Sequence, residues 1–164
     1  MNLSLRHPVL TLFPSHRSWL QWYRDRFASL APPARDSLSG RFQGQLVGPV
    51  WFRYGAQALL AVLGMRGWWG KEFGAQGRGV NLVRRGKDLR PSVPVVLREG
   101  RSRVDGRQGV QVEYPPECSW HWRLFVDELR WWDDETVLAM SRVELPWLRR
   151  LTLPFVLHRV VPAE

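Results

Sequence analysis

The sequence predicts a mainly β protein, an antiparallel barrel of about eight or more strands with an amphipathic helix before it and one short helix after the first strand. Short apolar segments follow one another at regular spacing after residue 65, separated by Gly, Asp or Pro, with no helical pattern between them. Parallel strands need crossover helices, so the sheet is antiparallel. A sheet of this many strands closes into a barrel or splits into a sandwich, and a glycine-spaced first strand with a single closing strand favours the barrel.

The composition fits one folded domain. The chain has 164 residues, of which 45% are hydrophobic, and it contains 10 Trp and a single cysteine, Cys118. A disordered chain lacks that much apolar surface to bury, and one cysteine excludes an intrachain disulfide framework or a multi-cysteine metal site. We expect an N-terminal arm and covering helix in residues 1–36 and the barrel in residues 37–164.

The net charge of +9 comes almost entirely from arginine, which supplies 22 of the 24 basic residues. The arginines are dispersed, and the longest clusters are the pairs at 84–85 and 149–150. A dispersed positive surface attracts polyanions only non-specifically, so we expect no specific nucleic-acid partner. The N-terminus lacks the continuous apolar run of a secretory signal and residues 56–65 are too short to span a bilayer, so we expect a cytoplasmic location.

Residues 16–30 predict the amphipathic helix. Its apolar stripe, at spacings of three and four, consists of Leu20, Tyr23, Phe27 and Leu30. A double proline at 32–33 ends the helix, and Trp19 and Trp22 widen its apolar face. Two uses stay open: a cover packed on the barrel, or a helix lying on a membrane surface, because Trp and Arg together suit the headgroup boundary.

The first strand lies within residues 38–49, where glycine recurs at every fourth position. This spacing predicts a sharply bent strand or a close approach of the backbone. A short helix over about residues 54–63 follows and ends at Gly64. The later strands are expected at 68–73, 80–84, 93–98, 101–104, 110–114, 120–127 with a continuation or new strand at 129–132, 136–143 and 153–160, with a turn at Asp105-Gly106.

Two motifs resemble a known family. Residues 40–44 (GRFQG) and 67–73 (GWWGKEF) resemble the G-x-W-x-G strand and the G-W-x-G-K-x-F element of small bacterial lipocalin-like barrels, which are mostly of unknown function. Residues 127–130 and 154–159 also fit, whereas Phe42 stands where the family has Trp. The resemblance covers roughly residues 38–160 and implies a calycin-like barrel, similar in outline to the haem-binding nitrobindin barrels.

A barrel of about eight strands can hold one small ligand in a mostly apolar interior. We therefore expect binding of a hydrophobic or amphipathic molecule, such as a fatty acid or a phospholipid-like molecule with an anionic head. The candidate binding residues are Lys71, Asn81, Arg130, Arg142, His158, Trp69 and Phe155. Inward-facing Arg130 and Arg142 would suit a carboxylate or phosphate, with aromatic side chains around the tail. The alternative is that they pair with Asp127, Glu128 or Glu144, or lie on the outside of the barrel.

Three other functions stay open. A small enzyme of the isomerase or cyclase type would use Arg130, Arg142 or His158, and a haem-binding barrel would ligate iron through His158. A membrane-surface protein would act through the N-terminal helix. We assign no catalytic residue and no metal site, because the sequence has no nucleophile elbow, phosphate loop or repeated ligand spacing. A binding protein is thus favoured over an enzyme, and peripheral membrane contact and a homodimer stay open.

Overall fold

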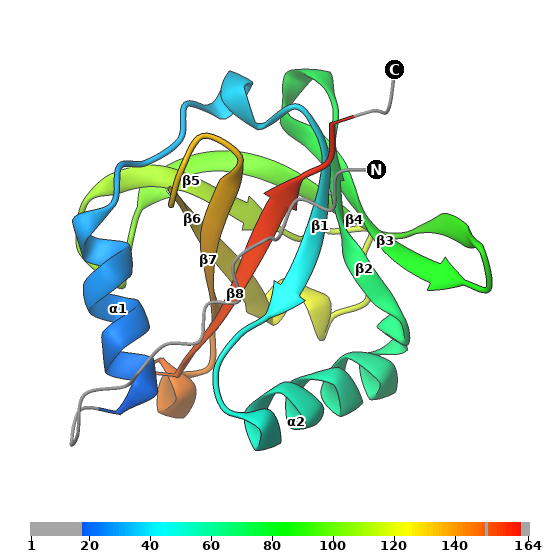
Figure 1. Ribbon diagram of the computed structural model, residues 1–164, viewed down its shortest axis with the longest axis horizontal. Helices are drawn as coiled ribbons and strands as arrows, with labels where there is room; N and C mark the ends of the chain where they lie inside the picture. Colours follow the sequence, from blue (N-terminus) through cyan, green and yellow to red (C-terminus); the bar gives the residue numbers. More distant parts are fainter. Residues whose placement is uncertain (1–17, 150, 162–164) are drawn as a thin grey trace, which may run out of the picture.

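The computed structural model, which describes residues 18–149 and 151–161, is a closed antiparallel barrel of eight strands. Each strand pairs with its neighbours in sequence, and β1 pairs with β8 to close the barrel (Figure 1). The strands are β1 (Gly40–Leu46), β2 (Trp68–Phe73), β3 (Arg78–Arg85), β4 (Asp88–Arg101), β5 (Gln108–Glu113), β6 (Phe125–Trp131), β7 (Thr136–Val143) and β8 (Thr152–Arg159). The predicted fold class is confirmed.

Two helices accompany the barrel. Helix α1 (Trp19–Ser29) precedes it, and α2 (Val50–Leu60) follows β1 and continues into a π-helical turn at Ala61–Met65. Single helical turns occur at Arg35–Leu38, Ala75–Gly77, Trp122–Leu124 and Pro146–Leu148. None of the helices in the described part of the chain has the length and apolar character needed to cross a lipid bilayer.

The up-and-down topology sends successive connections to opposite ends of the barrel. We call one of them the α2 end; it carries α2, and its connections are residues 47–67, 86–87, 114–124 and 144–151. The opposite end carries the connections 74–77, 102–107 and 132–135 and the segment 30–39 that leads into β1. Figure 1 shows α2 lying across the lower end of the barrel.

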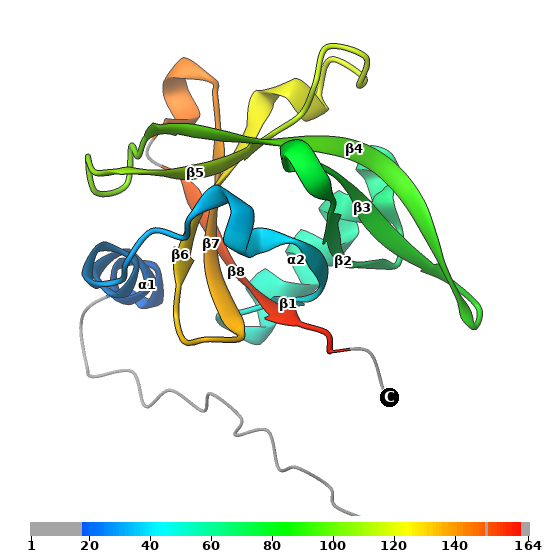
Figure 2. The same ribbon diagram turned by 90° about the horizontal axis from the view of Figure 1, so that it is seen from above.

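Apolar side chains fill the barrel and also cover part of its outer face. On β7, Val137 and Ala139 point into the barrel, whereas Leu138 and Met140 point outward. The outward pair is buried because α1 packs on it, with Phe27 fully buried at this contact. Figure 2 shows α1 beside β6 and β7 on the outside of the barrel. Strands β7 and β8 are therefore apolar on both faces, which explains the absence of a clean alternation in their sequence.

Three predicted boundaries are wrong. Residues 120–124 form turns rather than a strand, and β6 begins only at Phe125. Residues 101–104 are not a separate strand, because β4 runs unbroken to Arg101 and the connection at 102–107 contains the predicted Asp105-Gly106 turn. Helix α2 starts at Val50, four positions earlier than expected, directly after the Pro49 cap.

The glycine spacing in β1 reflects a close approach, as the sequence predicts. Gly44 lies against the indole ring of Trp68, and a Cβ atom at this position would overlap that ring. Because Gly44 has no side chain, Trp68 can lie over β1 at this position. This packing helps to shape the interior described next.

Candidate functional site: an internal cavity with a buried lysine

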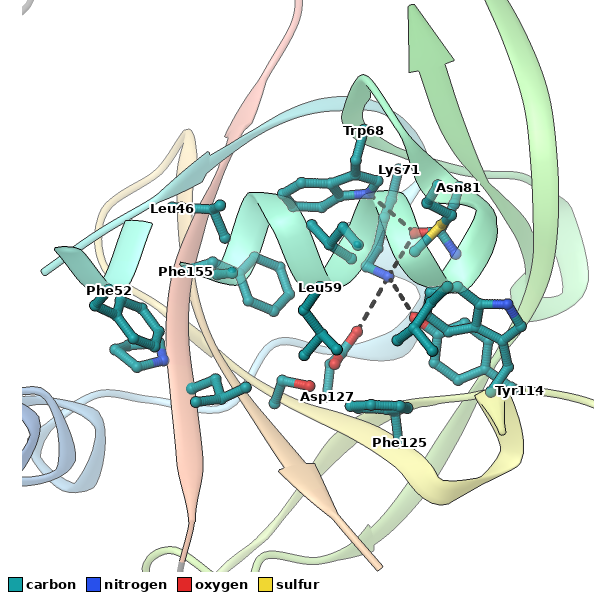
Figure 3. Close-up of a pocket in the computed structure, with 18 residues that line it drawn as sticks. Leu46, Phe52, Leu59, Trp68, Lys71, Asn81, Tyr114, Phe125, Asp127 and Phe155 are labelled. Atoms are coloured by element: carbon teal, nitrogen blue, oxygen red, sulfur yellow. Dashed lines mark hydrogen bonds and ion pairs between the residues drawn. The ribbon is translucent and has the colours of Figure 1, made fainter. Parts of the chain in front are cut away.

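A cavity of about 70 Å³ lies inside the barrel beneath α2 (Figure 3). Its wall is mostly apolar and includes Leu46, Met65, Trp68, Trp122, Phe125, Leu153, Pro154 and Phe155. The inner face of α2 and of the turn after it adds Phe52, Ala56, Leu59, Leu60 and Leu63. Helix α2 is therefore one wall of the cavity as well as the cover of this end of the barrel.

Four polar side chains meet at one side of the cavity, and we call them the Lys71 cluster: Lys71, Asn81, Tyr114 and Asp127. Lys71 Nζ lies 3.0 Å from Asp127 Oδ2 and donates hydrogen bonds to Asn81 Oδ1 at 2.9 Å and to the Tyr114 hydroxyl at 3.4 Å. Trp68 Nε1 donates to the same Asn81 oxygen at 3.1 Å. Figure 3 shows Asn81, Tyr114 and Asp127 around the lysine amine, with the Trp68 indole beside Asn81.

The strands place these groups by ordinary sheet geometry with one irregularity. Lys71 on β2 lies directly opposite Asn81 on β3, so both point into the barrel from neighbouring strands. A bulge between Trp68 and Gly70 inserts one extra residue into β2. Because of this bulge, Trp68 and Lys71 both line the cavity although they are three residues apart, and Trp69 does not line it.

Burial makes the charges of the cluster interdependent. Lys71 is 1% exposed and Asp127 is 3% exposed. Burial acts to lower the pKa of Lys71, but the interactions with Tyr114 and Asp127 outweigh it, and the pKa is raised above its ordinary value. Burial raises the pKa of Tyr114 to about 12. At neutral pH the cluster therefore holds a charged lysine beside a neutral phenol, and Asp127 supplies the counter-charge.

The structure brings together three of the seven residues proposed from the sequence. Lys71, Asn81 and Phe155 all line the cavity. Sequence reasoning missed Asp127 and Tyr114 as members of the same site. The signal for Asp127 lies in β6, where this carboxylate shares the inner face with Phe125 and other apolar residues.

Arg130 and Arg142 do not line the cavity, because both lie on the outer face of the sheet. Arg130 is fully buried, its Nη2 lies 3.0 Å from Asp105 Oδ1, and its guanidinium carbon lies 4.7 Å from the centre of the Phe27 ring. The site that the sequence places around inward-facing arginines therefore does not form.

Arg142 follows the alternative that we left open, in which it pairs with nearby carboxylates. Its Nε donates to Glu128 Oε1 at 2.8 Å, and a second ion pair joins it to Glu144. We call Asp105, Glu128, Arg130, Arg142 and Glu144 the outer charge cluster.

His158 and Trp69 also lie away from the cavity. His158 is on the outer face of β8, with Nε2 3.1 Å from Gln45 Oε1 and Nδ1 3.3 Å from Thr136 Oγ1. A haem inside the barrel would therefore not meet this imidazole. Across the described residues, no three His, Cys, Asp or Glu side chains are grouped so that they could hold a metal ion.

Fold and site together define a class: a small closed β-barrel with an apolar internal cavity and a buried ion pair in its wall. A crystal structure of a protein from Thermomonospora curvata is similar, with a TM-score of 0.63, 22% sequence identity, and coverage of 82% of this chain and 83% of that one. At this identity the likeness shows a shared fold. The sequence matches no protein-family model and no curated protein.

Proposed function

We propose that the barrel binds one small hydrophobic or amphipathic molecule in its cavity, with the polar end of that molecule at the Lys71 cluster. The observation that carries this proposal is the position of the buried Lys71–Asp127 pair, which lies in the wall of an otherwise apolar cavity. Binding sites for small molecules commonly combine apolar walls with a few placed polar groups.

The energetics of buried charge support the same proposal. Removing two charges from water costs several kcal/mol per ion, on the order of what their attraction returns, so a buried pair is a weak source of stability. An apolar pair of similar volume would fill the same space with no loss of folding stability. A pair retained beside open space is therefore better explained by an interaction with something that enters that space.

The charge balance bears on the head group of the ligand. Asp127 already neutralises Lys71, so a carboxylate or phosphate head would bring a second negative charge close to Asp127. A hydroxyl, an amide or a protonated carboxyl group would meet no such repulsion. We therefore rank neutral polar heads above the anionic head expected from the sequence, which would have to compete with Asp127 for Lys71.

The size of the cavity bears on the tail. A cavity of about 150 Å³ holds a benzene molecule, and this one measures about 70 Å³. A long acyl chain therefore needs α2 to move outward. Glycines with left-handed backbone flank this helix, Gly48 at φ 107° and Gly64 at φ 94°, and such positions can absorb the rotation of a cover.

The barrel topology and the motifs at residues 40–44 and 67–73 support a place for this chain among the small bacterial lipocalin-like barrels. The two alternatives that depend on other residues have less support. The enzyme and the haem protein were both built on Arg130, Arg142 or His158, and none of these side chains lines the cavity.

Native mass spectrometry of the purified full chain, followed by solvent extraction, tests the proposal. The probes are a fatty alcohol, a fatty acid and an alkane of equal carbon number. We expect the alcohol to bind more tightly than the other two, and Lys71→Met to abolish its advantage over the alkane. The matched control is Arg41→Met, since Arg41 is an exposed cation on the neighbouring strand β1. A protein that carries no bound molecule and binds none of the three probes would refute the proposal.

A further inference from the structure

The exposed apolar side chains are concentrated at one end of the barrel. Among the described residues, ten large apolar side chains are clearly exposed, and eight of them lie at the α2 end. Three are on α2 and the turn after it: Trp51 is 69% exposed, Tyr54 70% and Val62 84%. Trp120 and Trp147, in the connections 114–124 and 144–151, are 68% and 77% exposed. All the exposed aromatic residues of this set are therefore on the same end of the molecule.

The charge of the molecule is divided in the same direction. Among the described residues, the connections of the α2 end contain five basic and two acidic residues, whereas those of the opposite end contain three basic and five acidic residues. An ion pair between Arg103 and Glu144 joins the two sets. No acidic residue occurs between Asp36 and Glu72. Arg53 and Arg66 are exposed within this stretch, and in the described part of the chain neither side chain forms an ion pair. The α2 end is thus both apolar and positive.

From these two observations we propose that the α2 end docks on a membrane surface that carries anionic lipid. Trp and Tyr side chains favour the boundary between headgroups and acyl chains, and basic groups beside them are attracted to anionic headgroups. The inference does not rest on the ligand proposed above. It differs from the membrane contact considered in the sequence, which used the N-terminal helix.

Helix α1 is less suited to that contact because its tryptophans are engaged within the protein. The Trp19 ring lies 4.7 Å from the Phe52 ring, and the Trp22 ring lies 6.0 Å from the Trp132 ring. Both tryptophans are only partly exposed. On the outer surface of α2, the Trp51 ring lies 6.2 Å from the Trp19 ring but stays largely exposed, as do Tyr54 and Val62.

This surface could be covered by a bilayer, by a second copy of the chain or by residues 1–17 of the same chain. The charge of each occupant distinguishes the bilayer from the other two. A second copy of the chain would place Arg53 and Arg66 of both copies near one another. Residues 1–17 contain two Arg and two His but no acidic residue, so they share the sign of the surface. An anionic bilayer alone among the three has the opposite charge.

Docking in this orientation has a consequence for the cavity. Phe52, Leu59 and Leu63 face the cavity from the same helical segment whose outer side carries Trp51 and Tyr54. The docked protein therefore turns the cover of its cavity toward the lipid (Figure 1).

Vesicle flotation with the full chain tests the docking surface. We expect binding to vesicles of phosphatidylcholine with about a third phosphatidylglycerol, weak binding to phosphatidylcholine alone, and release at high salt. Each basic group near an anionic bilayer strengthens binding by about 1 kcal/mol. Arg53→Glu changes the local charge by two and should therefore weaken it about thirtyfold. Arg78→Glu, which makes the same charge change at an exposed position near the opposite end, should change it little.

A second pair of variants tests the apolar contribution. Tyr54→Ser combined with Trp147→Ser should abolish most of the vesicle binding, whereas Val161→Ser, at the opposite end, should retain it. Circular dichroism checks that each variant stays folded. Failure of the full chain to bind anionic vesicles, equal losses for Arg53→Glu and Arg78→Glu, or a stable dimer that does not float with vesicles would each overturn the proposal.

Discussion

Two clusters of buried charge lie on opposite faces of the same sheet, and their surroundings differ. In the outer charge cluster, Arg130 is enclosed by Asp105 and the Phe27 ring of α1. In the Lys71 cluster, the Lys71–Asp127 pair borders a cavity. The outer groups join α1 and the turn at 102–107 to the barrel, so their partners are all part of the fold. Buried charge alone therefore does not mark a binding site; buried charge beside open space does.

The largest effect should come from breaking the outer charge cluster. Arg130→Met removes the buried cation beneath α1 and leaves Asp105 with the exposed Arg107 as its remaining guanidinium partner. Breaking a buried pair in this way costs about 3–5 kcal/mol, and we expect a loss of about 4 kcal/mol in the free energy of unfolding. Urea unfolding followed by far-ultraviolet circular dichroism measures it. An unchanged midpoint would show that this cluster does not hold α1 in place.

The Lys71 cluster should respond differently to the removal of one or both charges. Lys71→Met leaves Asp127 buried without its cation and should cost about 3 kcal/mol. Lys71→Met combined with Asp127→Leu should recover stability to within about 1 kcal/mol of the natural protein, because a well-packed apolar pair can replace a buried ion pair. The same double variant should lose its preference for polar-ended ligands. If the double variant is as unstable as the single one, the pair is needed for the fold.

The two clusters should also lose their contributions to stability at opposite ends of the pH scale, the Lys71 cluster at alkaline pH and the outer charge cluster at acidic pH. Burial holds the pKa of Tyr114 at about 12, above its ordinary value of 10.0. This phenol therefore contributes stability that is complete below pH 10 and is lost as the pH rises toward 12, about 2–3 kcal/mol at most. Tyr114→Phe should remove this alkaline loss in urea titrations carried out between neutral pH and pH 12. An identical alkaline loss in the variant would mean that another group causes it.

Asp105 should control the fall in folding stability at acidic pH. Burial acts to raise the pKa of Asp105, but the hydrogen bonds from Arg107 and the charge of Arg130 outweigh it, and the pKa is lowered below 3.8. Its contribution is therefore present above pH 3.8 and is lost as the pH falls through the lower value in the folded state. Asp105→Asn should flatten the stability curve below pH 4, measured by thermal unfolding. If the variant loses stability at acidic pH as the natural protein does, other carboxylates cause the loss.

The sequence predicted much of the fold because strand alternation and turn residues are local signals. The bounds predicted for β2 and β7 agree with the structure. Residues 120–124 were misassigned because Trp120, Trp122 and Leu124 imitate the alternation of a strand, although they form turns after two prolines. A pattern of period two cannot distinguish a strand from a turn that happens to place large side chains at every second position.

The candidate site was predictable only in part, for related reasons. Lys71 and Asn81 were found because they lie on correctly predicted strands. Asp127 was considered only as an ion-pair partner for Arg130 or Arg142, whereas in the structure it faces the interior and pairs with Lys71. Arg130 was placed with the ligand because alternation separates two faces but does not say which one is inside, and here α1 buries the outer face as well.

The central claim is that the Lys71 cluster, and not another cation, receives the polar end of the ligand. The chain contains only two lysines, buried Lys71 and exposed Lys87, so protein labelled with ¹³C and ¹⁵N at lysine gives one pair of side-chain signals in the nuclear magnetic resonance spectrum. Titration with a fatty alcohol should shift the Lys71 signal, identified by its absence in Lys71→Met, and leave the Lys87 signal in place. Saturable binding of the alcohol with no change at Lys71 would contradict the account.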